Sequence, residues 1–209
     1  MLEPQKTHNP TGRLEAFSDG VFSIVITLLV FNIQVPRNLA EGQTLWQALL
    51  DSWPTELAFL IGFMLVGIMW VNHHNIFKLI GQTDHLLMVF NALLLLTIAL
   101  VPFTTAVLAE YIRTSEALTA TLVYNGLGVV VAVAFNIVWR YAAHQRRLIK
   151  AEVDQRIVDQ ISSNYRFGPL MYLAACALTL LSPALGIAVN IGLAIFFALP
   201  LNTELFGGD

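Results

Sequence analysis

The chain has 209 residues, of which 56% are hydrophobic and 12% are charged, and its formal net charge is −3. Soluble globular domains carry about twice this share of charged residues. Together with a mean hydropathy of +0.68, this composition excludes a soluble protein and indicates an integral membrane protein.

Six segments are apolar enough to cross a bilayer, for which a helix needs about 20 mostly apolar residues. The last two come from one stretch, which we divide at Ser182-Pro183 because proline lacks the donor that a continuing helix needs. We therefore predict an all-α polytopic membrane protein with one domain over residues 1–209 and six transmembrane helices near 14–35, 54–77, 84–108, 116–139, 165–181 and 184–200.

The first crossing begins with polar residues. Ser18, Asp19, Ser23 and Thr27 lie in its path, and a polar group in hydrocarbon costs free energy unless protein or water satisfies it. We therefore expect this helix to face protein or water.

Four further residues of the same helix form a stripe. At 100° per residue, Ile24, Thr27, Leu28 and Phe31 share an arc of about 100°. If several subunits brought this stripe to a common axis, Ile24 would lie nearest the cytosol and Phe31 about 10 Å further out. The alternative is plain helix packing, which is the usual meaning of this spacing. Asp19 and Ser23 lie off the arc, and we expect them to face neighbouring helices.

The second crossing contains adjacent histidines, His73 and His74, one turn after Trp70. Adjacent histidines on a helix point about 100° apart, and no carboxylate lies three or four residues from either. We therefore expect a polar cluster here and no metal site.

Sequence motifs for catalysis are missing. The chain has no convincing nucleophile, nucleotide-binding or metal-binding pattern, so we predict that it is not an enzyme, needs no cofactor and binds neither nucleotide nor nucleic acid. The Thr-Val-Gly-Tyr-Gly filter of common potassium channels is absent too, and no re-entrant pore loop is expected. Any ion conduction must use another device.

The longest connection, residues 140–166, is predicted to be a helical extension of the fourth crossing. Ile149, Val153, Ile157 and Ile161 repeat every four residues on one face. This pattern indicates an amphipathic segment on the membrane or against a neighbouring subunit, with a regulatory role as the alternative.

Lysine and arginine favour the cytoplasmic side in short connections. With the N-terminus inside, nine of them are cytoplasmic and only Arg37 and Arg113 lie outside, so both termini are predicted to be cytoplasmic. The nine are Lys6, Arg13, Lys78, Arg140, Arg146, Arg147, Lys150, Arg156 and Arg166.

The start of the first crossing carries a family signature. Its residues, Arg13-Leu14-Glu15-Ala16-Phe17-Ser18-Asp19, resemble the Arg-x-x-x-Phe-Ser-Asp motif of the transmembrane protein 175 potassium channels in their short prokaryotic form. Outside this crossing the resemblance rests on chain length, six crossings and the neighbourhood of residues 70–74.

The resemblance implies a potassium-selective, leak-type channel of a prokaryotic plasma membrane, embedded in lipid as a homotetramer, with K⁺ as its permeant ion. Its pore would be lined by the first helix. Ile24 would form a hydrophobic constriction that acts as gate and filter, Thr27 would supply hydroxyls, and Leu28 and Phe31 would form further rings. Phe31 departs from the aliphatic residue expected there, so its ring can also pack aside.

The signature residues would then form a structural network at the cytoplasmic end. Arg13, Phe17, Ser18 and Asp19 belong to it, with Trp70, His73 and His74 as the expected hydrogen-bonding partners on the second crossing. Two other functions stay open. A cation or proton-coupled transporter would use Asp19 with His73 or His74 as a relay, and a membrane scaffold would need only helix packing. Sensing of pH by the histidines is a further alternative.

Overall fold

The computed structural model describes residues 11–37 and 39–198, and within these ranges the chain forms eight α-helices and two short 3₁₀ segments. The one β-type contact in the described part is an isolated antiparallel bridge between Ile80 and Ile149. Lys6, residues 199–200 of the predicted sixth crossing and both chain ends lie outside the described residues.

The first crossing consists of α1 (Gly12–Leu28) and the 3₁₀ segment η1 (Leu29–Asn32). It was predicted to reach residue 35, but Ile33 has φ −78° and ψ 111°, which is extended backbone. The chain then enters an outer connection that holds a short helix, α2 (Leu45–Asp51), which the sequence analysis missed. Thr44 and Gln47 cap its start by bonding each other's backbone.

The second and third crossings differ in regularity. The second is the single helix α3 (Trp53–Leu79). The third was predicted as one helix, but it divides at Leu100 into α4 (His85–Ala99) and α5 (Val101–Tyr111). Pro102 in the first turn of α5 explains the break, because it has no N–H to continue the hydrogen-bond ladder of α4.

The prediction that residues 140–166 extend the fourth crossing is wrong. That crossing, α6 (Ala117–Ala143), is followed by the 3₁₀ segment η2 (His144–Arg146), where Gln145 and Arg146 have φ of 51° and 55°. Left-handed backbone ends an α-helix. The rest of the connection leads into α7 (Gln155–Leu181), which therefore begins ten residues before the predicted fifth crossing.

The division between the last two helices is confirmed. Ser182 is extended, with φ −162° and ψ 130°, and α8 (Pro183–Ala198) begins at the proline. Among the described residues, four helical segments are long and apolar enough to span a membrane, and α8 is a shorter apolar helix. The count of six crossings stays a prediction. The four segments are Gly12–Asn32, Trp53–Leu79, His85–Tyr111 and Ala117–Arg146.

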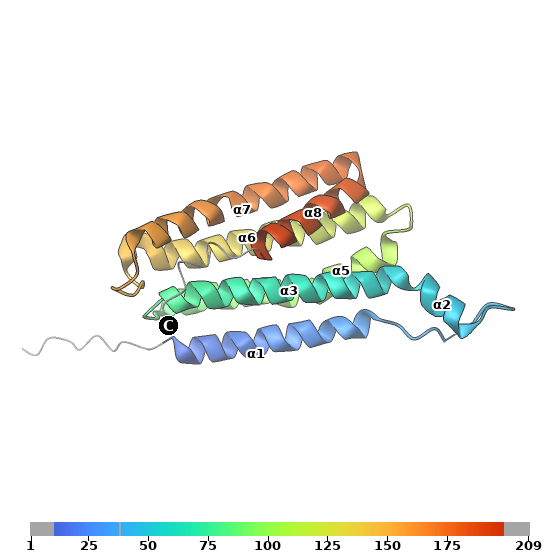
Figure 1. The fold of residues 1–209 in the computed structure, drawn as a ribbon, viewed down its shortest axis with the longest axis horizontal. Coiled ribbons are helices and arrows are strands. Elements are labelled where there is room, and N and C mark those ends of the chain that lie inside the picture. Colours follow the sequence, from blue (N-terminus) through green and yellow to red (C-terminus); the bar gives the residue numbers. More distant parts are fainter. Residues whose placement is uncertain (1–10, 38, 199–209) are drawn as a thin grey trace, which may run out of the picture.

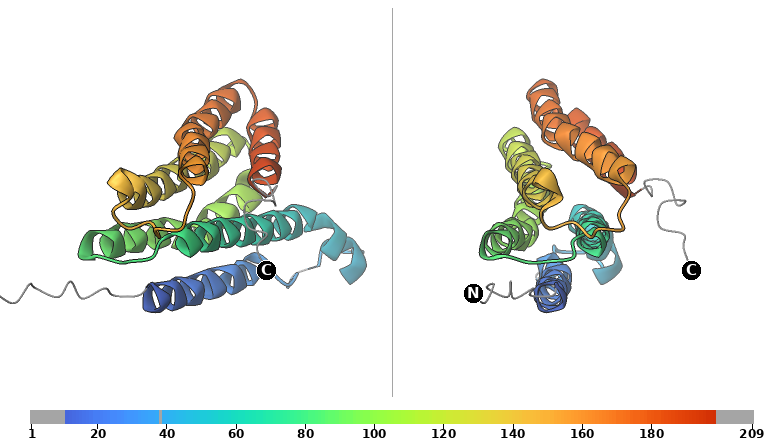
Figure 2. Two further views of the ribbon diagram at one scale, coloured as in Figure 1. Left: turned by 60° about the vertical axis from the view of Figure 1, so that its left-hand side comes forward. Right: turned by 90° about the vertical axis from the view of Figure 1, so that its left-hand side faces the viewer.

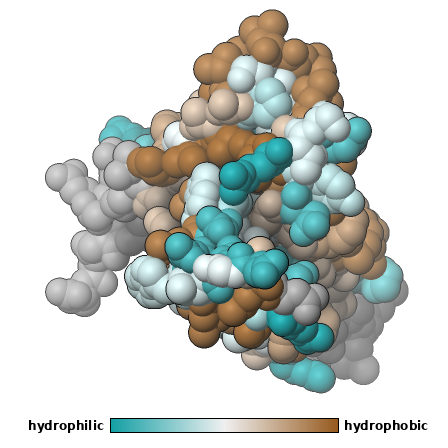
Figure 3. Space-filling model, turned by 90° about the vertical axis from the view of Figure 1, so that its right-hand side faces the viewer, coloured by the Kyte–Doolittle hydropathy of each residue, from teal (hydrophilic) through white to brown (hydrophobic). Residues whose placement is uncertain are grey.

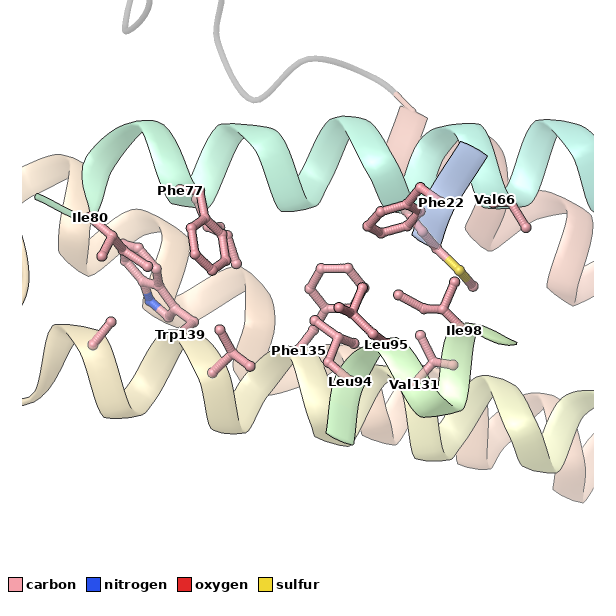
Figure 4. Close-up of a cluster of buried hydrophobic side chains, with 14 of the residues drawn as sticks. Phe22, Val66, Phe77, Ile80, Leu94, Leu95, Ile98, Val131, Phe135 and Trp139 are labelled. Atoms are coloured by element: carbon pink, nitrogen blue, oxygen red, sulfur yellow. The ribbon is translucent and has the colours of Figure 1, made fainter. Parts of the chain in front are cut away.

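The long helices run side by side and alternate in direction (Figures 1 and 2). At one side of the bundle α1 packs on α3 and α4, and at the other α7 and α8 pack on α6. The helix α6 also contacts α4 and α5, so it joins the two sides. Large buried side chains from α1, α3, α4 and α6 fill the space between them, as the close-up of Phe22, Phe77, Leu94, Phe135 and Trp139 shows (Figure 4).

One end of the bundle contains the start of α1, the end of α3 and the turn from α6 to α7 (Figure 1). The opposite end, where α3 and α6 begin, carries hydrophilic side chains across its centre with hydrophobic ones around them (Figure 3). A polar end face next to apolar helix walls is the arrangement expected where a bundle leaves a membrane.

Two loops at the first end are joined by backbone hydrogen bonds. Leu79 O accepts from Lys150 N at 3.0 Å, and Leu148 O accepts from Gly81 N at 2.9 Å. Beside them, Asp84 Oδ2 accepts hydrogen bonds from the Tyr141 hydroxyl at 2.6 Å and from Arg147 at 2.8 Å.

The charge of Asp84 is stabilised by this arrangement. Partial burial alone would raise the pKa of Asp84, but the hydrogen bonds from Tyr141 and the Leu87 amide, with the charge of Arg147, lower that pKa below its usual value. Asp84 also caps α4 by accepting from Leu87 N at 2.9 Å. The carboxylate therefore connects the start of α4 to the end of α6.

Candidate functional site

The first crossing, formed by α1 and η1, has two opposite faces. Phe22, Val25 and Leu29 are at most 3% exposed and point into the bundle. On the other side Ile24 is 60% exposed, Leu28 43% and Phe31 77%, and Thr27 is exposed as well. The predicted stripe is therefore a continuous surface of one chain.

The stripe extends toward the start of α1. Phe17 is 61% exposed and falls within about 20° of Ile24 at 100° per residue. Arg13 is exposed on the same side and forms no hydrogen bond or ion pair with the described residues. The structure thus places Phe17 and Arg13 outside the network that was expected to contain them. Among the described residues, the Phe31 ring stays exposed and does not pack aside.

Hydroxyl groups on α1 are satisfied within the helix. Thr27 Oγ1 lies 2.8 Å from Ile24 O and 3.1 Å from Ser23 O, and it donates its proton to these backbone carbonyls. Ser23 Oγ donates to Asp19 O at 2.8 Å. Ser23 was expected to face a neighbouring helix, but it is exposed. Because each hydroxyl uses its proton on a carbonyl, its oxygen lone pairs remain available to a cation.

A buried network fastens α1 to two other helices. Asn91 Nδ2 on α4 donates to Ser18 Oγ at 2.9 Å, and Asn91 Oδ1 lies 2.9 Å from His73 Nε2 on α3. An amide oxygen only accepts, so His73 carries its proton on Nε2. All three side chains are at most 1% exposed.

Aromatic rings surround His73 within this network. Its ring stacks on Phe77 with centroids 4.3 Å apart, and Phe22 meets it edge-on at 5.4 Å. These contacts exclude water from the hydrogen bonds. Ser18, Asn91 and His73 therefore form one closed connection between α1, α3 and α4.

A second, more exposed contact uses the next residue of the signature. Asp19 Oδ1 accepts from Trp70 Nε1 at 2.8 Å, and the Trp70 ring stacks on His74 with centroids 5.8 Å apart. Ser18 and Asp19 project about 100° apart, so each reaches a different partner. The structure thus brings together five of the seven predicted residues, but it pairs neither Asp19 nor Ser18 directly with a histidine. The five are Ser18, Asp19, Trp70, His73 and His74.

Asn91 is the member of the buried network that was not predicted from the sequence. It was detectable as the one polar residue between Leu86 and Leu96 of an otherwise apolar segment. A polar residue at such a position usually bonds another helix, since hydrocarbon offers it no partner. Among the described residues no three His, Cys, Asp or Glu side chains gather as a metal site would require.

Known proteins are similar in sequence to this chain over almost its whole length. The family model described as endosomal/lysosomal potassium channel TMEM175 matches residues 13–102. A potassium channel of Chamaesiphon minutus is 48% identical over 193 residues, which are 92% of this chain and 95% of that one. A potassium channel of Streptomyces collinus is 39% identical over 190 residues, covering 90% and 92% of the two chains.

A solved structure shows the same arrangement of helices. The crystal structure of a lysosomal potassium-selective channel TMEM175 homolog from Chamaesiphon minutus matches with a TM-score of 0.82 at 47% identity, over 90% of this chain and 96% of that one. The likeness therefore includes α6 to α8 as well as the helix that carries the signature.

Proposed function

Because the chain belongs to the TMEM175 family, whose members are ion channels and not enzymes, we propose that it is a potassium-selective, leak-type channel. In this proposal the first helix of each subunit lines a central pore. The observation that carries it is the stripe of α1, which leaves Ile24, Leu28 and Phe31 exposed on the edge of the bundle.

A pore of this kind requires several copies of the chain. One subunit offers a single α1, and a single helix cannot enclose a path for ions. We propose a homotetramer, in which four copies of the stripe meet at one axis and the remaining apolar surface faces lipid. The basic residues at the end where α1 begins support a cytoplasmic position for that end, and we place the channel in a prokaryotic plasma membrane.

Ile24 is proposed as the constriction. A ring of isoleucine side chains provides no oxygen ligands, so an ion passes only when the ring widens, and closure acts by expelling water. Potassium surrenders its water more readily than sodium does. An apolar ring therefore favours potassium through the cost of dehydration.

Thr27 compensates part of this cost. Its oxygen lies almost one turn beyond Ile24 and retains lone pairs for a cation. Leu28 and Phe31 would then form the wider, outer part of the path. The network of Ser18, Asn91 and His73 would hold α1 at a fixed distance from the axis.

Transport through a relay of Asp19 and the histidines is the second candidate, and no contact favours it. Asp19 bonds the Trp70 indole, which has no basic atom to pass a proton onward. His73 bonds Asn91, and an amide does not relay protons readily either.

Reconstitution of the purified chain into planar bilayers tests the proposal. We expect unitary currents in potassium solutions and smaller currents when sodium replaces potassium. Saturable flux without unitary steps would support the transporter. Complete absence of ion flux from correctly folded protein would support a scaffold.

A further inference from the structure

The C-terminal end of the first crossing is fastened to the bundle by a side-chain hydrogen bond. Asn32 is the last residue of η1, and its Nδ2 atom donates to Pro102 O on α5 at 3.0 Å. The next residue, Ile33, is extended, so the chain leaves the helix there. The contact joins two elements that are 70 residues apart in sequence, at the end of the bundle where α3 begins (Figure 1).

Leu29 holds the same face of η1 against the bundle. It is fully buried, and a Cβ atom at Gly62 on α3 would lie 3.1 Å from Leu29 Cδ2, so the glycine lets Leu29 pack closely there. Residues three apart lie above one another in a 3₁₀ helix, and each step turns by about 120°. Leu29 and Asn32 therefore share the face on the bundle, and Phe31 projects about 120° away from Asn32, on the exposed side.

Thr105 on α5 is an alternative donor to Pro102 O. Its hydroxyl has no hydrogen-bond partner among the described residues, although the residue is only 1% exposed. A threonine within a helix can donate to the carbonyl three or four residues earlier, which here is Pro102 O or Val101 O. Thr104 donates to Val101 O at 3.2 Å, and Asn32 donates to Pro102 O at 3.0 Å. Both local acceptors of Thr105 are thus already occupied.

Asn32 and Thr105 compete for one carbonyl. A carbonyl oxygen has two lone pairs, and inside α5 the backbone N–H four residues later uses one of them. Only one side-chain donor can therefore use the other. When Asn32 bonds Pro102 O, the Thr105 hydroxyl is unpaired. When Thr105 bonds it after a rotation about χ1, the Asn32 amide is free to bond water.

We propose that Asn32 is a positioning residue for the outer part of the pore, and that Pro102 O exchanges between Asn32, which holds η1 on α5, and Thr105, which releases it. The proposal rests on the proposed function, because it assigns η1 to the wall of the pore. In the held arrangement Phe31 points to the axis at a fixed angle. In the released arrangement the last turn of the crossing moves away from α5 and changes the width of the path, whereas Ile24, two turns earlier, keeps its place.

Spin labelling measures this exchange without any ion current. The label is attached to a cysteine at Phe31 in the full chain with Cys176 replaced by alanine, diluted with a diamagnetic analogue, and the protein is reconstituted in lipid nanodiscs. We expect Asn32→Leu to raise the ratio of mobile to immobile label about two- to tenfold, the shift that loss of one neutral hydrogen bond produces. A label at Ile24 should keep its spectrum.

Asn72→Leu is the matched control. Asn72 is also half-buried, and its amide donates to two backbone carbonyls, Ile68 O at 3.0 Å and Phe197 O at 3.3 Å, which belong to α3 and α8. This variant should leave the label at Phe31 unchanged. An equal change in both variants, or no change in Asn32→Leu, would overturn the proposal.

The Thr105→Val variant gives a second test, with the opposite sign. Valine has the shape of threonine without the hydroxyl, so the variant folds, removes the alternative donor and leaves Pro102 O to Asn32. We expect the ratio of mobile to immobile label at residue 31 to fall, again by about two- to tenfold. An unchanged or larger ratio would contradict the exchange.

Planar-bilayer recording separates this proposal from the proposed function. Label mobility that responds as expected, with no current from the native chain, would contradict the channel while confirming the exchange at Pro102. Potassium currents from the native chain, with unchanged label mobility in Asn32→Leu and Thr105→Val, would overturn the exchange and leave the channel function standing.

Discussion

Neighbouring residues of the signature act on different partners because a helix turns by about 100° at each step. Ser18 is fully buried and bonds Asn91, whereas Asp19 is exposed and bonds Trp70. Ile24 projects about 120° away from Ser18 around α1, at the middle of the stripe. Substitutions at Ser18, Asp19 and Ile24 should therefore affect different contacts of α1.

Replacing Ile24 by Asn should increase the current severalfold and reduce the preference for potassium over sodium. An amide brings hydrogen-bonding groups into the apolar ring and lowers the cost of hydration there. Val30→Asn is the control, because Val30 is 48% exposed but lies off the stripe. Single-channel conductance and reversal potentials measure both effects. Unchanged conductance and selectivity in Ile24→Asn would remove Ile24 from the pore.

The Asp19→Asn variant should retain potassium current. Its amide oxygen can still accept from Trp70 Nε1, so the contact with α3 survives and the Tm should change little. Asp19→Leu, which removes the acceptor, should lower the free energy of unfolding by the contribution of one hydrogen bond, about 0.5 to 1.5 kcal/mol, and the Tm should fall with it. Loss of flux in Asp19→Asn at an unchanged Tm would instead favour a proton relay.

At the scale of elements, the turn between α7 and α8 depends on one glycine. A Cβ atom at Gly186 would lie 1.9 Å from Thr179 Oγ1 and 3.0 Å from Asn125 Nδ2, whereas one at Gly192 on the same helix would meet nothing within 4 Å. We expect Gly186→Ala to destabilise the protein by about 1 to 3 kcal/mol. Gly192→Ala should be close to neutral. Thermal unfolding in detergent compares them, and equal Tm values would contradict the close packing of α8 on α7.

The loops joined by Asp84 predict a dependence of stability on pH. The pKa of Asp84 is lowered in the folded protein, so its stabilising effect is present above the ordinary carboxyl pKa of about 3.9 and is lost as pH falls through the lower folded value. Asp84→Asn should therefore reduce the Tm at pH 7, and the difference from the native chain should shrink below pH 4. Glu152→Gln, an exposed change in the adjacent turn, is the control. If the difference in Tm between Asp84→Asn and the native chain did not change with pH, the charge of Asp84 would not contribute to stability.

Helix positions were more predictable from sequence than helix ends and partners. The stripe of α1 and the turn at Ser182-Pro183 follow from local rules of periodicity and backbone geometry. The break at Leu100 was also detectable at Pro102. The left-handed residues Gln145 and Arg146 were not, because neither is a residue type that favours this backbone, and tertiary contacts hold them: Arg146 donates to Val153 O at 2.6 Å.

Partners across helices could not be predicted for a different reason. Asn91 and Ser18 are 73 residues apart, and their contact depends on how α1 and α4 pack. Ser18 is predictable as a neighbour of the second crossing, but the rotation of α4 about its axis does not follow from the sequence. The place of Phe17 on the stripe, by contrast, was predictable from the helical period alone, because Phe17 falls within about 20° of Ile24 at 100° per residue.

At the scale of the whole molecule, each side of the bundle is connected by one central asparagine. Asn91 joins α1, α3 and α4 through Ser18 and His73, and Asn125 joins α6, α7 and α8. Both networks are buried, so their hydrogen bonds do not compete with water. Among the described residues, the stripe of α1 stays exposed, so it is available to a second copy of the chain, to lipid or to water.

A cysteine scan along α1 tests most directly whether four copies of the stripe enclose the pore. Single cysteines at Ile24, Leu28 and Phe31 would be introduced with Cys176 replaced by alanine, and Val30→Cys would serve as the exposed control. Silver ions, which are close to potassium in size and bind thiolates, would be added during recording. The account predicts irreversible block at the three stripe positions and persistent current in Val30→Cys. Block at Val30 alone, or no block at any stripe position, would contradict it.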